Sequence, residues 1–99
     1  MNRFPTKQQY TEQVGTSFTA AVAGRESFEL KLTDVESLIS TDKQECFSLR
    51  FLAPPAALPL QDLYDLSHEV LGNAALLMVP VKKQDDGIIF EVVFNNFVA

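Results

Sequence analysis

The stretch QDLYDLSHEVLGNAALLMVPV, residues Gln61–Val81, decides the fold of this chain. In its first part Tyr64, Leu66 and His68 fall on one face and alternate with other residues, which indicates a strand with one buried side. Gly72 then permits a tight connection. The residues that follow are apolar at almost every position, and this pattern predicts a central strand that is covered on both faces.

The segments before and after this stretch are expected to pair with it. Residues 28–32, FELKL, show the clearest alternation of apolar and polar side chains. Near the N-terminus, Thr6 and Gln9 form a capping-box pattern that starts a short helix. We expect a helix over about residues 6–14 and strands over about residues 16–22, 27–35, 45–53, 62–68, 74–81 and 88–95. Without helical crossovers between the strands, this spacing predicts a mainly-β domain of about six antiparallel strands, in a small barrel or sandwich with one short N-terminal helix.

The composition argues against several classes of protein. A chain of 99 residues, 46% of them hydrophobic, predicts one folded domain. Its net charge of −5, without a basic cluster, argues against binding to nucleic acid. Cys46 is the single cysteine, so no internal disulfide can form. No segment has the apolar length of a membrane span or the apolar core of a signal peptide, so we expect a soluble, cytoplasmic protein, compatible with incorporation into a larger assembly.

No group of residues has the pattern of a catalytic, cofactor or metal site. His68 is the only histidine, and we interpret it as a hydrogen-bonded residue that secures a strand end. Cys46 follows Glu45 and lacks the basic neighbours that activate a catalytic thiol. The string Asp85-Asp86-Gly87 lacks the ligand spacing of a calcium loop and instead predicts a tight hairpin turn. We therefore expect a non-enzymatic protein that holds no cofactor and no metal.

A set of apolar residues falls on the face that is expected to contact water. Its members are Leu52, Leu76, Met78, Ile89 and Val93. If the last two strands are neighbours, these residues form one contiguous patch, and exposed apolar patches commonly mark interaction surfaces. The patch has two possible partners. Either the N-terminal helix covers it, through Tyr10 and Val14, or a second protein binds to it, as a different partner or as another copy of the chain.

The string Tyr64-x-Leu66-x-His68-x-x-Leu71-Gly72 is the most specific part of a wider pattern. The pattern also includes Phe28-x-Leu30-x-Leu32, Phe47-x-Leu49-x-Phe51, Val79-Pro80-Val81 and Phe90–Asn95. In this order, from Thr6 to Asn95, the sequence resembles a family of small bacterial domains of unknown function that are often encoded beside phage-tail-collar-like fibre proteins. The resemblance implies a structural or accessory role near such assemblies, and it implies no catalytic activity.

Two functions are favoured at the level of the sequence, and a small enzyme with His68 as its base ranks below both. The first is a structural or protein-interaction domain that docks on a partner, or on copies of itself, through the apolar outer face. The alternative is a module that binds a small molecule or a peptide in the mouth of a barrel near Tyr64 and His68.

Overall fold

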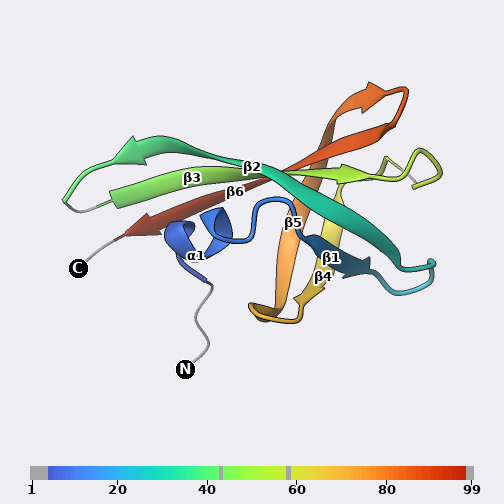
Figure 1. The fold of residues 1–99 in the computed structure, drawn as a ribbon, viewed down its shortest axis with the longest axis horizontal. Coiled ribbons are helices and arrows are strands. Elements are labelled where there is room, and N and C mark those ends of the chain that lie inside the picture. Colours follow the sequence, from blue (N-terminus) through green and yellow to red (C-terminus); the bar gives the residue numbers. More distant parts are fainter. Residues whose placement is uncertain (1–4, 43, 58, 98–99) are drawn as a thin grey trace.

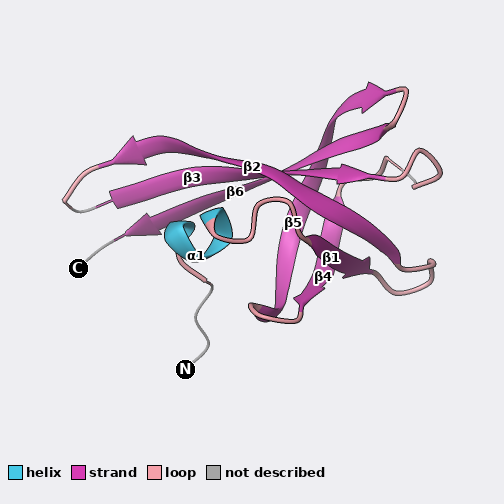
Figure 2. Cartoon of the chain, viewed as in Figure 1, coloured by secondary structure: helices cyan, strands magenta, loops and turns pink. Residues whose placement is uncertain are grey.

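A computed structural model describes residues 5–42, 44–57 and 59–97 of the chain. The elements in chain order are the helix α1 (Lys7–Thr11) and the strands β1 (Ser17–Ala21), β2 (Phe28–Ser40), β3 (Gln44–Ala53), β4 (Asp62–His68), β5 (Gly72–Gln84) and β6 (Gly87–Phe97). All neighbouring strands are antiparallel, and the order β1-β2-β3-β6-β5-β4 closes into a barrel through the β1–β4 pair (Figure 1, Figure 2). The predicted mainly-β fold of six antiparallel strands and one short helix is confirmed.

Several strands, β2 and β5 most of all, are longer than their sequence patterns predicted, and the helix is shorter. β2 continues to Ser40 and β5 continues to Gln84, whereas α1 ends at Thr11. The register of β2 on β3 shifts twice, and that of β5 on β6 shifts once near Pro80. Each such irregularity can add a residue to one strand and reverse the alternation of its side chains. The period-two pattern therefore breaks while the backbone pairing continues.

Part of the sheet extends beyond the barrel as a three-stranded wing. The wing consists of residues 35–40 of β2, 44–49 of β3 and 92–97 of β6, which pair with each other after β1 and β5 have separated from them (Figure 1). α1 lies against the inner face of this wing. The ring of Tyr10 is 6.3 Å from that of Phe47 and 5.6 Å from that of Phe94, centroid to centroid.

The start of α1 is held by its own side chains. Thr6 Oγ1 accepts a hydrogen bond from the Gln9 N–H, and the Gln9 side chain accepts one from the Thr6 N–H. The predicted capping box is thus confirmed. Because a helix of five residues is not stable alone, its position depends on the burial of Tyr10, which is 2% exposed.

Aromatic and aliphatic side chains fill the barrel from every strand. The ring of Phe18 meets that of Phe51 edge-on at 5.2 Å, and the Tyr64 ring meets that of Phe90 at 6.1 Å. The most completely buried large side chains are Tyr64, Phe47, Phe51, Phe90, Leu32, Leu49, Met78 and Ile88. As the alternation predicted, β3 and β6 therefore direct Phe47, Phe51, Phe90 and Phe94 inward.

β5 faces the opposite way from the prediction. Leu76 and Met78, expected on the outer face, are 5% and 0% exposed, whereas Leu77 is 50% exposed. The cause is the register of the β4–β5 hairpin, which places Leu76 opposite Tyr64. Directly paired residues of an antiparallel sheet lie on the same face, so the inward Tyr64 places Leu76, and then Met78, in the core.

Candidate functional site

The three remaining residues of the predicted outer patch do not form a contiguous surface. Leu52 and Ile89 are cross-strand partners. Val93 lies opposite Ser48, and this pair is two outward-facing rows away from the Leu52–Ile89 pair. The row between them is charged. It contains the pair Arg50–Glu91, which separates Val93 from the Leu52–Ile89 pair.

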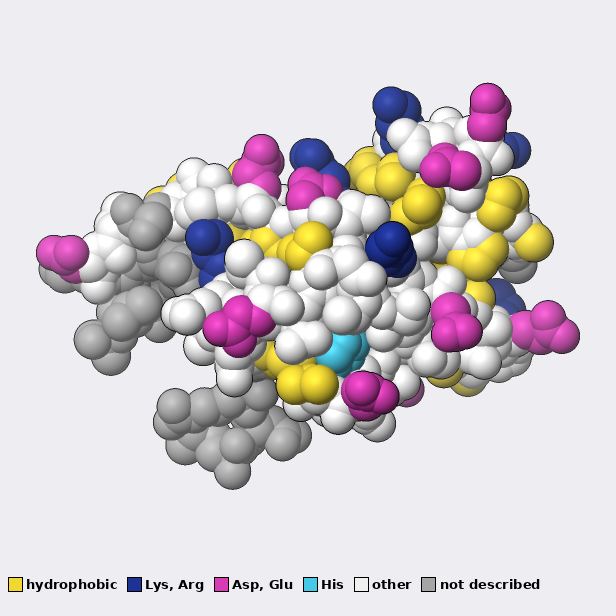
Figure 3. Space-filling view, viewed as in Figure 1, with side chains coloured by type: hydrophobic (Ala, Val, Ile, Leu, Met, Phe, Trp, Pro, Cys, Tyr) yellow, Lys and Arg dark blue, Asp and Glu magenta, His cyan; other side chains and the backbone are white. Residues whose placement is uncertain are grey.

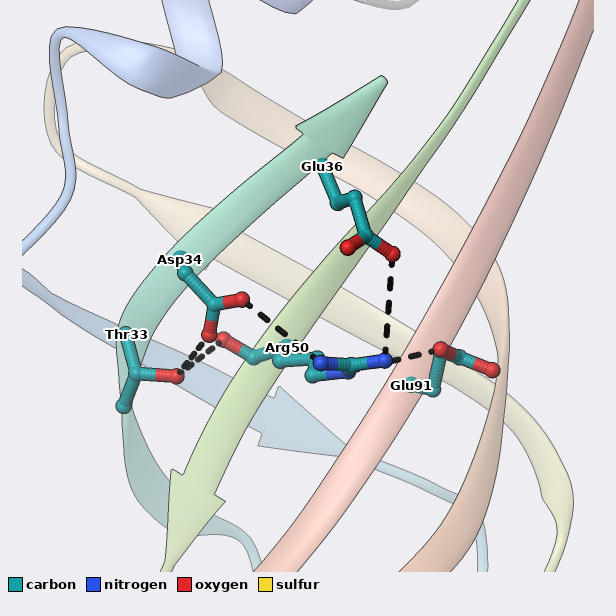
Figure 4. Close-up of polar contacts among 5 residues, drawn as sticks. All are labelled: Thr33, Asp34, Glu36, Arg50 and Glu91. Carbon is teal, nitrogen blue, oxygen red and sulfur yellow. Dashed lines mark hydrogen bonds and ion pairs between the residues drawn. The ribbon is translucent and has the colours of Figure 1, made fainter. Parts of the chain in front are cut away.

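Arg50 lies at the centre of a four-residue ion cluster that spans β2, β3 and β6 (Figure 4). Its guanidinium nitrogens are 3.8 Å from an Asp34 carboxylate oxygen, 4.0 Å from Glu36 and 3.5 Å from Glu91. The Thr33 hydroxyl is within hydrogen-bonding distance of both Asp34 and the Arg50 carbonyl. Since these side chains are partly to largely in contact with water, each pair contributes at most about 1 kcal/mol, and the main effect of the cluster is to keep this outer face polar.

The N-terminal helix does not cover the outer face, so the first of the two predicted coverings is wrong. Tyr10 lies on the inner side of the wing, in the core. Val14, the second residue expected to provide cover, is itself 42% exposed.

Apart from Leu38 and Ile39 of β2 and Val93 of β6, the exposed large apolar side chains of the strands lie on β4 and β5. Leu63 and Leu77 are direct cross-strand partners and are 57% and 50% exposed. Val79 follows Leu77 by two residues and lies on the same face of β5. Val81 is 49% exposed and has no cross-strand partner on β6, because the register shifts between Pro80 and Lys82. We call these four residues the outer strip. Sequence reasoning missed it, although an inward Tyr64 and Leu66 already implied that Leu63 faces outward.

A cavity of about 330 Å³ opens at one mouth of the barrel. Its lining is mostly apolar and consists of Val22, Arg25, Glu26, Ser27, Phe28, Pro54, Ala56, Ala57 and Tyr64. The Arg25 guanidinium lies 5.8 Å from the centre of the Tyr64 ring and is ion-paired with Asp62. The Tyr64 hydroxyl donates to the Leu60 carbonyl, so the wall of the cavity is held by its own hydrogen bond.

His68 does not share this mouth with Tyr64, and the prediction of one pocket formed by both residues is wrong. The two side chains point inward from opposite ends of β4, and His68 lines a different hollow, beside Gln13 and Thr16. Four residues of an extended strand span about 13 Å, so one small ligand cannot contact both side chains.

Both nitrogens of the His68 ring have protein partners. Nδ1 accepts hydrogen bonds from the N–H groups of Val70 and Leu71, at 3.0 and 3.2 Å. The ring proton therefore lies on Nε2, which is 2.8 Å from the Thr16 hydroxyl. That hydroxyl donates in turn to the Gln13 carbonyl. The interpretation of His68 as a residue that secures a strand end is confirmed by this geometry, since His68 closes the β4–β5 turn and ties it to Thr16, the residue before β1.

The described residues meet neither the requirements of a metal site nor those of a membrane-spanning helix. They contain no cluster of three or more histidine, cysteine or acidic side chains arranged to hold a metal ion. Among the same residues, no helix is long and apolar enough to cross a membrane. Acidic and basic side chains are distributed over the face drawn in Figure 3, in places next to one another, and hydrophobic atoms gather toward the end that carries the β5–β6 hairpin.

Together these features define a small antiparallel β-barrel with a helix-covered wing and an apolar strip on its outer surface. A family model described as a domain of unknown function, DUF6916, matches residues 5–94. The chain belongs to this family. Comparison with curated proteins and with solved structures finds no match.

Proposed function

We propose that the chain is a non-enzymatic structural or protein-interaction domain that docks through the outer strip. The observation that carries this proposal is the Leu63–Leu77 pair. Two leucines that face each other across a central strand pair, both half exposed or more, form a local apolar surface rather than scattered single residues.

The rigidity of the underlying barrel favours docking. Leu63 and Leu77 are next in sequence to the buried Tyr64, Leu76 and Met78, which face the opposite side of the sheet. The packing of these neighbours in the core therefore holds the backbone of both leucines in place. Covering the exposed half of each leucine is worth about 1 kcal/mol, half of the value for a fully buried side chain. A partner therefore has to add further contacts to the strip to offset the cost of association.

Capture of partners by a tagged chain in its native cell tests the proposal. Leu77→Lys places a charge in the outer strip and should abolish capture of any stoichiometric partner. Val93→Lys is the matched control, because Val93 is also 55% exposed on the outer surface but lies beyond the Arg50 cluster. Equal capture by both variants, or no partner for the unmodified chain, would contradict docking through the strip.

We place this role beside a phage-tail-like or fibre assembly, with the protein cytoplasmic until it is incorporated. The support for this placement is the sequence resemblance to small bacterial domains that are often encoded beside phage-tail-collar-like fibre proteins. A small closed barrel with an apolar outer strip suits an accessory of such an assembly.

The mouth cavity favours a second function, the binding of a small molecule or of one peptide side chain. Its volume of about 330 Å³ and its aromatic wall suit a small apolar group. A thermal-shift screen with metabolites and short peptides tests this function. Ala57→Phe fills the cavity from its rim and should remove any shift, and a panel without shifts would exclude this function for the compounds tested.

A further inference from the structure

The outer strip has charges of opposite sign at its two ends. Asp65 lies at one end, where it is exposed and pairs with Ala75, on the outward row adjacent to the Leu63–Leu77 pair. Lys82 lies at the other end, where it pairs with the outward-facing Ile89. Both side chains are exposed, and neither belongs to an ion pair of the described residues. The surface thus runs from acidic, through apolar, to basic along β5.

Other charges near the strip do not disturb this order. Glu91 is the cross-strand partner of Val79, but its carboxylate is held by Arg50. Asp62, which precedes Leu63, is paired with Arg25. Among the charges on the outward rows of the strip, Asp65 and Lys82 are therefore the two that are left for an external contact.

A surface of this kind is complementary to itself. A two-fold rotation exchanges its ends, so that the acidic end of one copy meets the basic end of the other. Asp65 pairs with Ala75, which precedes the Leu77–Val79 segment of β5, and Lys82 follows that segment. Measured along β5, the two charges are about equally far from the segment. An axis through that segment therefore stacks the apolar centres and pairs the charges in one operation.

We propose, resting on the proposed docking function, that the occupant of the outer strip is a second copy of this chain, related by a two-fold axis near Leu77 and Val79. Asp65 of each copy then contacts Lys82 of the other, in two equivalent ion pairs. The four half-exposed or partly buried apolar residues supply far less than the roughly 800 Å² per partner of a standard interface. The dimer is accordingly weak, as suits a contact that is repeated within an assembly.

Sedimentation velocity of the purified chain, from about 10 μM to about 1 mM, tests this arrangement through a charge-swap cycle. The unmodified chain should shift from monomer toward dimer over this range. Asp65→Lys alone and Lys82→Asp alone each create two like-charge contacts and should weaken dimerisation about tenfold or more. The double variant should restore the dissociation constant to within about threefold of the original.

Two matched controls carry the same charge changes outside the contact. Lys83→Asp alters the neighbouring residue, whose partner Ile88 is buried on the opposite face, and Glu29→Lys alters an exposed residue of β2. Neither should change dimerisation, and circular dichroism verifies that each variant is folded. A chain that remains monomeric at about 1 mM, or a double variant that is not restored, overturns the two-fold contact. If capture of a foreign partner still depends on Leu77, the proposed docking function survives that result; if it does not, both proposals fail.

Discussion

Alanine substitutions at the adjacent residues Met78 and Leu77 separate the two faces of β5. Met78 is 0% exposed and Leu77 is 50% exposed. Met78→Ala removes a wholly buried side chain and leaves a cavity, so the free energy of unfolding should fall by about 2–5 kcal/mol. Leu77→Ala removes about three carbon atoms whose surface is already half in water. At about 0.8 kcal/mol per buried methylene, this loss amounts to about 1 kcal/mol, without a cavity.

Urea unfolding followed by far-ultraviolet circular dichroism measures both values, since the chain has no tryptophan to report fluorescence. The slope of the free energy against urea should be the same for all three proteins, which would show that the surface exposed on unfolding has not changed. In thermal unfolding, each kcal/mol should lower Tm by about 4–8 °C for a domain of this size. Met78→Ala should therefore melt well below Leu77→Ala.

A larger loss for Leu77→Ala than for Met78→Ala would refute the register of the β4–β5 hairpin. A shift of one residue in that register would turn Leu77 inward and Met78 outward. Equal losses would mean that both faces of β5 are covered, as the sequence pattern alone predicted.

Three further substitutions test the wing, the His68 contacts and the β5–β6 hairpin. Burial raises the pKa of Tyr10 to about 12, whereas a tyrosine of the unfolded chain titrates near 10, so the unfolded state loses this proton first as the pH rises. The free energy of unfolding should therefore fall by about 2–3 kcal/mol between about pH 10 and 12, and Tyr10→Phe should remove this loss in urea titrations. His68→Ala leaves the Val70 N–H without its acceptor and should cost about 1–3 kcal/mol, with faster amide exchange in the turn. Gly87→Ala would place a methyl group against the Ala53 carbonyl oxygen and should lower stability by at least about 2 kcal/mol in the same urea assay.

Each of these three has an outcome that would contradict its basis. An alkaline loss that persists in Tyr10→Phe would assign it to another group. Full stability of His68→Ala would mean that water replaces the ring at no cost. Gly24→Ala is the control for Gly87→Ala, because Gly24 also has a positive φ but has open space around it; equal losses would leave only backbone strain as the cause.

The strands whose patterns alternate could be predicted from the sequence with their inward faces. β3 and β6 place a phenylalanine, leucine or valine at every second position of their inward rows, and the apolar side chains that they bury are those expected. The face of β5 could not be read in this way, because Leu76, Leu77 and Met78 are equally apolar. Its orientation depends on the residues opposite, and those are set by the three-residue turn after His68.

The candidate surfaces depend on contacts between segments that are distant in the sequence. Arg50 interrupts the predicted patch only because β3 lies between β2 and β6, which brings three carboxylates around it. Arg25 reaches the Tyr64 mouth for the same reason, since β1 closes on β4. Alternation along one strand carries no information on such neighbours, and the outer strip became visible only with the register of the hairpin.

The barrel is closed by a short seam. β1 joins β4 through Thr19–Ser67, Ala20–Leu66 and Ala21–Asp65 alone, whereas the hairpins β2–β3 and β4–β5 pair residues that are close in sequence. Bringing distant segments together costs more chain entropy than closing a hairpin. The β3–β6 pairing is also long-range but extends over the full length of β3. We therefore expect the hairpins to form early and the short seam to form last, so that long-range pairing sets the rate of folding. For the same reason we expect the seam to open first when the barrel unfolds locally. A barrel that has not closed exposes two unpaired strand edges, one on β1 and one on β4.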